Sequence, residues 1–221
     1  MKAELDIRMA GLGGQGVVTA AHILGTAAMN KGQHPTANPF FGAEKRLAPA
    51  ESYVRISHEP IYDRGEILYP DIIMIFSPEV ITRGKSYTMP FYSGLAKRGV
   101  VLINSEEPIL SDREEAGMRE LEAKIVYVPA TKLAVEYAGT ELATNMTMLG
   151  ALCGTVDLVE IAFVIEALEE RFAGKKRFVA SGTTAALDEG LKKKYAKLSQ
   201  MIEKNTAAIT RAFSYVQDAT S

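Results

Sequence analysis

The chain has 221 residues, of which 25 are basic and 27 acidic, so its formal charge is −2. Hydrophobic residues make up 47% and charged residues 24%, which excludes wholesale disorder and indicates a globular protein. The near-neutral charge argues against nucleic-acid binding, and the sequence contains no run of 18 apolar residues that would span a membrane. The charged N-terminus lacks the apolar stretch of a signal peptide and predicts a cytoplasmic protein.

The chain is poor in residues that bind metals. It has a single cysteine, Cys153, and three scattered histidines, His22, His34 and His58. One thiol cannot hold an iron–sulfur cluster, a cysteine-rich zinc site or an internal disulfide. We therefore expect no metal site in this chain, so any metal needed for redox chemistry must lie on another chain. Because no basic neighbour lowers the pKa of Cys153, we assign this residue to packing.

The N-terminal region has the pattern of a strand, a glycine turn and a helix. A short apolar stretch at residues 5–10 leads into Gly11-Leu12-Gly13-Gly14-Gln15-Gly16. An alanine-rich, largely apolar helix is predicted over residues 17–30, and Gly32 is placed to end it. Residues 33–50 contain three prolines and a charged cluster, so they are predicted to form an irregular loop.

The next part of the chain alternates between apolar strands and helices. Residues 52–57 alternate in polarity and are predicted to pair with residues 60–62 in an antiparallel hairpin. Continuous apolar runs predict buried strands at residues 71–76, 100–104 and 124–128. Helices are predicted in a stretch ending near residues 97–99 and over residues 132–138, 146–155, 158–172 and 185–216.

This order of elements predicts an α/β fold, a three-layer domain with a mixed, mostly parallel sheet and a helical C-terminal extension. The composition changes at Gly174-Lys175-Lys176-Arg177, after which the chain becomes polar. We therefore divide the chain into an α/β domain over residues 1–174 and a helical C-terminal segment over residues 175–221.

The glycine motif is the first candidate for a binding site. Gly11, Gly13 and Gly16 satisfy G-x-G-x-x-G between a strand and a helix, where the backbone can approach a phosphate. However, residues 34–39 supply neither the second strand nor the acid that binds a ribose, and residues 17–18 lack the Lys and Ser or Thr of a P-loop. Three interpretations remain: an independent nucleotide site, a packing turn, and a loop facing a ligand held mainly by another subunit.

Several separate motifs resemble the gamma chain of the 2-oxoacid:ferredoxin oxidoreductases, the pyruvate:ferredoxin oxidoreductase family. The resemblance begins at residues 11–21 and continues, in order, through Phe40-Phe41-Gly42-Ala43-Glu44-Lys45-Arg46, Ala48-Pro49 and Tyr53-Val54-Arg55-Ile56. It then includes Pro70-Asp71, Asn104, Ala130-Thr131-Lys132 and Asn145-Met146-Thr147-Met148-Leu149-Gly150-Ala151. In all, it covers residues 5–174 and 205–213.

The resemblance implies a subunit of a complex that oxidatively decarboxylates a 2-oxoacid to acyl-coenzyme A and CO2. In that family other chains hold thiamine diphosphate, Mg²⁺ and the iron–sulfur clusters, coenzyme A is the co-substrate, and electrons pass to ferredoxin or an NAD-linked acceptor. The implied partners are the thiamine diphosphate-binding and ferredoxin-like subunits. No catalytic residue is expected in this chain, which would help to enclose the coenzyme A side of the active site and hold the assembly together.

The resemblance also implies a shared site for coenzyme A. Its candidate residues are Gly11, Gly13, Gly14, Gln15, Gly16, Phe41, Lys45 and Arg46. Lys45 and Arg46 could pair with the phosphates of the coenzyme, or they could form ion pairs with another subunit. The alternative function is a free-standing α/β module that binds a nucleotide through the glycine loop.

Two further expectations concern the C-terminal half. Asn145 directly precedes an apolar helical stretch and is predicted to be a helix N-cap. Residues 178–199 are an insertion relative to the family pattern, and we expect this segment to be a helical arm that contacts a partner specific to this complex.

Overall fold

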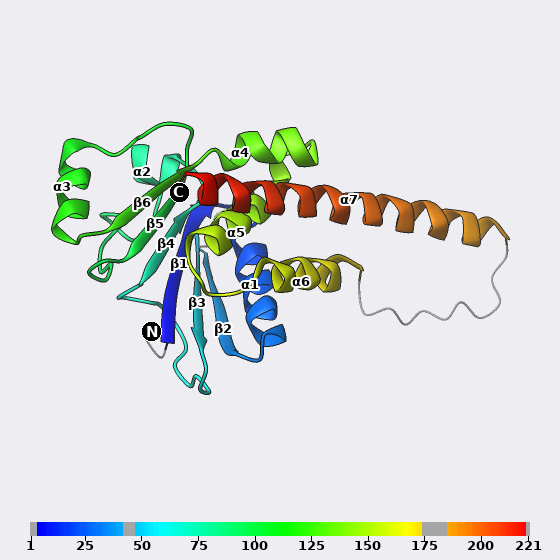
Figure 1. The fold of residues 1–221 in the computed structure, drawn as a ribbon, viewed down its shortest axis with the longest axis horizontal. Helices are drawn as coiled ribbons and strands as arrows, with labels where there is room; N and C mark the ends of the chain where they lie inside the picture. Colours follow the sequence, from blue (N-terminus) through cyan, green and yellow to red (C-terminus); the bar gives the residue numbers. More distant parts are fainter. Residues whose placement is uncertain (1–3, 42–46, 174–184, 220–221) are drawn as a thin grey trace.

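In the part of the chain that the structure describes, a six-stranded sheet forms the centre of the fold, in the order β2-β3-β1-β4-β5-β6 (Figure 1). The structure is a computed structural model, and it describes residues 4–41, 47–173 and 185–219. The strands are β1 (Glu4–Leu12), β2 (His34–Phe41), β3 (Pro49–Ser57), β4 (Ile72–Ile75), β5 (Val100–Asn104) and β6 (Lys124–Val128). β1, β4, β5 and β6 are parallel neighbours, whereas β3 is antiparallel to both β1 and β2. The predicted α/β fold with a mixed, mostly parallel sheet is confirmed.

The apolar strands were predicted at the positions where the structure has them. All four residues of β4 are buried, and so are the last four of β5. Both strands lie inside the sheet with protein on each face, which requires apolar side chains at successive positions rather than an alternating pattern.

The segment predicted as an irregular loop, residues 33–50, forms strand β2 over residues 34–41 instead, and its last two residues begin β3. Pro35 and Pro39 pointed to a loop, but β2 is an edge strand whose described neighbour is β3, and prolines are tolerated at a sheet edge. The predicted hairpin is also wrong. β3 pairs with β2 and β1, and residues 58–71 contain no strand.

Four helices cover one face of the sheet (Figure 1). These are α1 (Val17–Asn30), α5 (Thr144–Thr155), α6 (Ile161–Ala173) and α7 (Ala185–Asp218). α5 is the central helix of this layer and is buried almost throughout. It lies so close to α7 that a Cβ atom at Gly150 would overlap the backbone oxygen of Ile209. Glycine is therefore required there by the helix–helix distance.

The opposite face is covered more thinly, by α2 (Glu79–Thr82), α3 (Asp112–Glu120) and the segment between α2 and β5. Residues 84–99 form turns, so the helix predicted to end near residues 97–99 is wrong. Pro90 interrupts that stretch, and Gly94 has a φ of +77°, a conformation that ends helices rather than continuing them.

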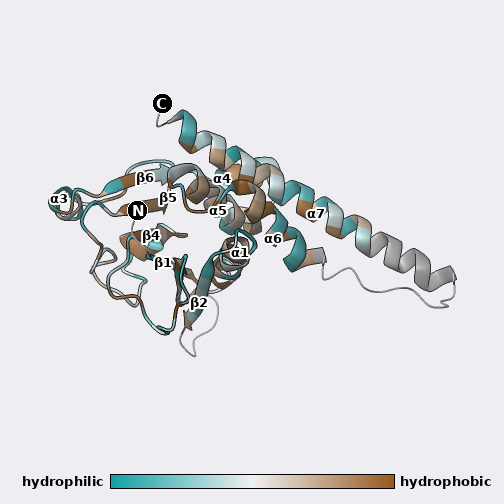
Figure 2. Cartoon of the chain, turned by 60° about the horizontal axis from the view of Figure 1, so that its bottom comes forward, coloured by the Kyte–Doolittle hydropathy of each residue, from teal (hydrophilic) through white to brown (hydrophobic). Residues whose placement is uncertain are grey.

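The C-terminal third is helical, as predicted. After β6 come α4 (Ala130–Leu133), the π-helical turn η1 (Ala134–Ala138) and the 3₁₀ turn η2 (Glu141–Ala143), before α5 begins. Helix α7 projects beyond the sheet in Figure 1, and Figure 2 shows hydrophilic and hydrophobic residues alternating along it. No helix in the described ranges is both long and apolar enough to cross a membrane. The boundary at residue 174 and the role of residues 178–199 stay predictions, and residues 174–184 lie outside the described part of the chain.

Candidate functional site

A cavity lies at the carboxyl edge of the parallel strands, where β1 and β4 are neighbours. The chain leaves β1 toward α1 on one face of the sheet and leaves β4 toward α2 on the other face. Such a divergence opens a crevice in which α/β proteins commonly bind ligands. The cavity here has a volume of about 450 Å³ and is lined by Gly13, Gly14, Gln15, Leu47, Phe76, Thr131, Glu141, Leu142 and Thr144.

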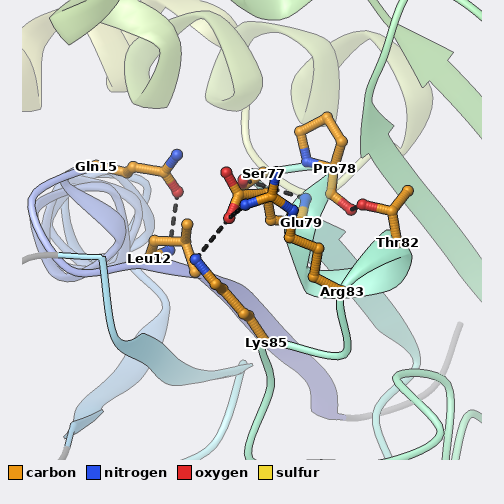
Figure 3. Close-up of polar contacts among 8 residues, drawn as sticks. All are labelled: Leu12, Gln15, Ser77, Pro78, Glu79, Thr82, Arg83 and Lys85. Atoms are coloured by element: carbon orange, nitrogen blue, oxygen red, sulfur yellow. Dashed lines mark hydrogen bonds and ion pairs between the residues drawn. The ribbon is translucent and has the colours of Figure 1, made fainter.

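The conformation of the glycine loop is fixed by the side chain of Gln15 and by the segment before β3. The Gln15 side-chain oxygen accepts a hydrogen bond from the Leu12 backbone N–H at 2.8 Å, and Figure 3 shows its amide nitrogen directed away from that contact. The Gly13 N–H donates to the Ala48 carbonyl at 2.8 Å, and the Leu47 N–H donates back to the Gly13 carbonyl at 3.2 Å. The loop therefore has a fixed backbone, with Leu47 beside it.

Asn145 contacts the end of the glycine loop. Its side-chain nitrogen donates to the Gly16 carbonyl at 3.2 Å, and a Cβ atom at Gly16 would overlap that nitrogen. Gly16 also has a φ of +72°, which favours glycine independently. The prediction that Asn145 is an N-cap is wrong: it is the second residue of α5, whose N-cap is Ala143. Asn145 connects α5 to the start of α1.

Hydrogen bonds connect the cavity-lining residues Thr131 and Thr144 to Asn104, which lies behind them at the end of β5. The Asn104 amide, at the end of β5, donates to the Phe76 carbonyl at 2.9 Å and to the Thr131 hydroxyl at 2.9 Å, and its oxygen accepts from the Thr131 N–H at 3.1 Å. The Thr131 hydroxyl lies 3.3 Å from that of Thr144. Because the Thr144 hydroxyl donates to the Glu141 carbonyl at 2.7 Å, the Thr131 proton is left for Thr144 or for a ligand.

The lining is suited to a ligand rich in hydrogen-bond acceptors. The Thr131 hydroxyl and the Gln15 amide nitrogen are donors in or beside the cavity, and Glu141 is the single acid among the lining residues. One carboxylate without a thiolate does not match the ligand sets of Mg²⁺ or of an iron–sulfur cluster. The described residues contain no group of three or more His, Cys, Asp or Glu side chains that could hold a metal ion.

A cluster of charged side chains lies on the α2 side of the same edge (Figure 3). The Lys85 ammonium is 2.6 Å from the Glu79 carboxylate, and the Arg83 guanidinium is 3.4 Å from it. The Lys85 N–H also donates to the Glu79 carbonyl at 3.2 Å. The hydrogen bond from Lys85 holds the pKa of Glu79 below its usual value. The cluster has two cations for one carboxylate, so it carries a net positive charge.

The turn that follows Lys85 is fixed by a buried carboxylate on β3. The Glu51 side chain accepts hydrogen bonds from the backbone N–H groups of Tyr87 (3.0 Å) and Thr88 (3.1 Å) and from the Ser86 hydroxyl (2.8 Å). It also accepts a bond from the Tyr53 hydroxyl at 2.9 Å. Burial, and then the nearby Glu51 charge, raise the pKa of Tyr53 above its ordinary value.

The structure divides the predicted loop residues into two groups. Gly13, Gly14 and Gln15 line the cavity, whereas Gly11 and Gly16 do not. Gly11 is a packing position, because a Cβ atom there would lie 2.7 Å from the Val17 side chain. The loop is thus a packing turn at its ends, as one of the three interpretations expects, and it lines a cavity in its middle. Whether a ligand there is held by this chain alone or shared with another subunit stays a prediction.

The other three predicted site residues cannot be placed against the cavity. Phe41 is the last residue of β2 and pairs with Ala50, and its side chain lies outside the described part of the structure, as do Lys45 and Arg46. Their role stays a prediction. Leu47, which follows Arg46 directly in the chain, does line the cavity.

Sequence reasoning missed several lining residues, among them Thr131, Thr144 and Leu142. The first belongs to the motif Ala130-Thr131-Lys132, which was noticed without a site role. Cys153, by contrast, was correctly assigned to packing. It packs against the main core, and burial raises its pKa to about 12, so it is not a reactive thiol.

Comparison with known proteins identifies related chains. The family model of pyruvate ferredoxin/flavodoxin oxidoreductase matches residues 6–190. The common gamma subunit of the pyruvate/ketoisovalerate oxidoreductases of Thermococcus kodakarensis is 36% identical over 172 residues, which are 77% of this chain and 88% of the relative. The pyruvate synthase subunit PorC of Methanothermobacter marburgensis is 39% identical over 171 residues, again 77% and 88% of the two chains.

Solved structures share the fold. Pyruvate oxidoreductase subunit PORC of Thermotoga maritima matches with a TM-score of 0.68 at 21% identity, over 96% of this chain and 97% of its own. The 2-oxoglutarate:ferredoxin oxidoreductase of Magnetococcus marinus, solved with 2-oxoglutarate, coenzyme A and succinyl-CoA bound, matches with a TM-score of 0.70 at 19% identity. That match covers 100% of this chain and 32% of the larger one. At these identities the likeness concerns the fold alone.

Proposed function

The chain belongs to the pyruvate ferredoxin/flavodoxin oxidoreductase family as a gamma-type subunit, and from this premise we propose that it acts within a multi-subunit, thiamine diphosphate-dependent 2-oxoacid oxidoreductase. The complex would decarboxylate a 2-oxoacid, transfer the acyl group to coenzyme A and pass the electrons to ferredoxin or a similar acceptor. Mg²⁺ and the iron–sulfur clusters are assigned to other subunits because the cavity lining here does not match their ligand sets, and thiamine diphosphate is assigned to another subunit by the family resemblance.

The observation that carries this proposal is a binding cavity with an exposed apolar rim. Gly13, Gly14, Gln15 and Thr131 form a polar side of the cavity, yet Leu47 and Leu142, which also line it, are 60% and 78% exposed. Large apolar side chains at the rim of a polar cavity are typical of a surface that a partner covers. We infer that another subunit completes the site.

The co-substrate assigned to this shared site is coenzyme A. The donors of the cavity suit an acceptor-rich ligand, and Lys45 and Arg46 directly precede Leu47 at the rim. Arginine forms paired, charge-assisted hydrogen bonds with phosphate, whereas lysine supplies a point charge. The pair would therefore hold a phosphate of the coenzyme at the entrance.

The alternative of a free-standing dinucleotide-binding module has less support. In such folds the strand after the first helix lies beside β1 and ends in an acid that binds the ribose. Here β3 separates β2 from β1, and β2 ends in Phe40-Phe41. The position that should recognise a ribose is therefore absent from the described sheet.

The test is purification of the native complex through a tag on this chain, followed by assays with a panel of 2-oxoacids. We expect co-purification of thiamine diphosphate-binding and ferredoxin-like subunits, and 2-oxoacid-dependent reduction of a viologen dye that requires coenzyme A. A chain that purifies alone and binds a dinucleotide at micromolar concentration would contradict the proposal and favour the free-standing module.

A further inference from the structure

We propose that a second surface beside the glycine loop binds the nucleotide end of coenzyme A, with the adenine on the rings of Phe40 and Tyr87 and a phosphate on Arg83 and Lys85. This inference rests on the proposed function and deepens it, because it assigns Arg83, Lys85 and Tyr87, which the family resemblance did not single out. Arg83 and Lys85 lie on the α2 side of the glycine loop (Figure 3), whereas the cavity is lined from the other side by residues of α4, η2 and α5.

The aromatic part of this surface is an exposed pair of rings. Phe40, near the end of β2, and Tyr87 meet edge to face with their centroids 5.0 Å apart and an interplanar angle of 84°. Each residue is 39% exposed, so the pair is incompletely covered by the chain itself. A nucleobase can stack on such rings without base-specific hydrogen bonds, and base–aromatic stacking is a substantial source of affinity.

The cationic part lies two residues before the aromatic part in the chain. Lys85 is held twice by Glu79, through its ammonium and through its backbone N–H, so its position is defined before any ligand binds. Arg83 makes one long contact with the same carboxylate, and its side chain is largely exposed. Since one carboxylate cannot neutralise two cations, the cluster has charge available for a phosphate.

The buried carboxylate of Glu51 fixes the turn that connects these two parts. Burying a carboxylate is costly unless its oxygens are hydrogen-bonded, and those of Glu51 are bonded to Ser86, Tyr87 and Thr88. Glu51 is paired with Ala10 on β1, directly before the glycine loop. The carboxylate therefore holds the backbone of Tyr87 near the end of β1, and Lys85 lies two residues before Tyr87 in the chain.

Arg8 fixes the continuation of the same segment. Its buried guanidinium donates to the Phe91 carbonyl at 2.8 Å and to the Ser93 carbonyl at 3.0 Å. Together Arg8 and Glu51 anchor both ends of the stretch that carries the aromatic ring. A preorganised surface loses little conformational freedom when a ligand binds, which favours a binding role over a mobile surface turn.

The test uses the assembled complex and steady-state kinetics with coenzyme A. We expect the double variant Arg83→Ala/Lys85→Ala and the variant Tyr87→Ala each to raise the KM for coenzyme A about tenfold with kcat nearly unchanged, whereas Tyr87→Phe keeps the wild-type KM. Lys97→Ala is the matched control. It also breaks a 2.6 Å lysine–glutamate pair, with Glu122, but Lys97 precedes β5 at the opposite edge of the sheet.

The outcomes separate this inference from the proposed function. An active complex whose KM for coenzyme A is the same in all variants overturns the inference and leaves the proposed function intact. Direct binding of adenosine 3′,5′-bisphosphate, the nucleotide half of coenzyme A, is measured by calorimetry on the same complexes. If wild type binds it and Arg83→Ala/Lys85→Ala does not, the nucleotide surface is supported even where no oxidoreductase activity is found. No binding to wild type overturns it.

Discussion

The Asn145 side-chain nitrogen lies 3.2 Å from the Gly16 carbonyl oxygen, although 129 residues separate the two in the sequence. This contact joins the first turn of α5 to the residue that begins α1, and it occupies the space that a side chain at position 16 would need. The shape of the glycine loop therefore depends on a helix from the C-terminal half of the domain, as well as on its own glycines.

Gly16→Ala should destabilise the chain by about 2–5 kcal/mol. The left-handed conformation costs an alanine about 1–2 kcal/mol, and the overlap with Asn145 adds a packing cost of about 1–3 kcal/mol. The measurement is urea unfolding of the purified chain. Gly14→Ala is the control, because Gly14 also has a positive φ but faces open space, so only the backbone cost applies. Equal losses for the two variants would show that Asn145 does not constrain position 16.

Gly150→Ala and Gly25→Ala should change stability in opposite directions. Both glycines lie inside helices, but a Cβ atom at Gly150 would overlap the backbone of Ile209, whereas the nearest atom at Gly25 is 3.7 Å away. Forced separation of α5 and α7 should cost about 1–3 kcal/mol, and the better helix propensity of alanine should gain up to about 1 kcal/mol at position 25. Thermal unfolding of the two variants checks this. A stabilised Gly150→Ala variant would contradict the close packing of α5 on α7.

Stability should fall as the pH rises above 9, in part because of Cys153. Burial raises the pKa of this thiol from 9.0 to about 12, so the unfolded chain releases the proton at a lower pH than the folded chain. The unfolded state then binds fewer protons, and the free energy of unfolding declines between pH 9 and 12, by about 1 kcal/mol at pH 10. Urea unfolding at pH 8 and pH 10 measures this decline. In Cys153→Ala the part due to the thiol should disappear, and an identical decline in both proteins would contradict it.

Leu142→Asp should weaken assembly of the complex without unfolding the chain. Leu142 is exposed at the cavity rim, so a charge there costs the isolated chain little but would be buried uncompensated under a partner. Co-purification of the other subunits is the measurement, and we expect at least a tenfold loss of yield. Leu68→Asp is the matched control, since Leu68 is also exposed but precedes β4 at the opposite edge of the sheet. Normal assembly of Leu142→Asp would place the interface elsewhere.

Local sequence patterns were sufficient for much of the fold. The runs that became β4 and β5 are apolar at nearly every position, and burial on both faces of a sheet produces that pattern directly. β6 is also mostly apolar, but it is an edge strand of the described sheet in which only Val128 is buried. The glycine loop was also visible, because a strand, clustered glycines and an alanine-rich helix occur in immediate succession. Strand β2 could not be predicted from the sequence, because its prolines are typical of a loop. They are compatible with a strand only at the edge of a sheet, and that position is set by the tertiary structure.

The sequence by itself determined the fold class and the glycine loop, because these depend on residues that are neighbours along the chain, and its separate motifs indicated the family. Only the tertiary structure decided that Thr131 and Thr144 complete the cavity, that Asn145 contacts the loop, and that Glu51 holds the turn bearing Lys85. Near-neutral charge and a single cysteine could exclude functions but could not locate a site. The physical reason is that hydrogen bonds between distant segments form only where the sheet and its helices bring those segments together. A pattern of neighbouring residues in the sequence does not predict which distant segments will be in contact.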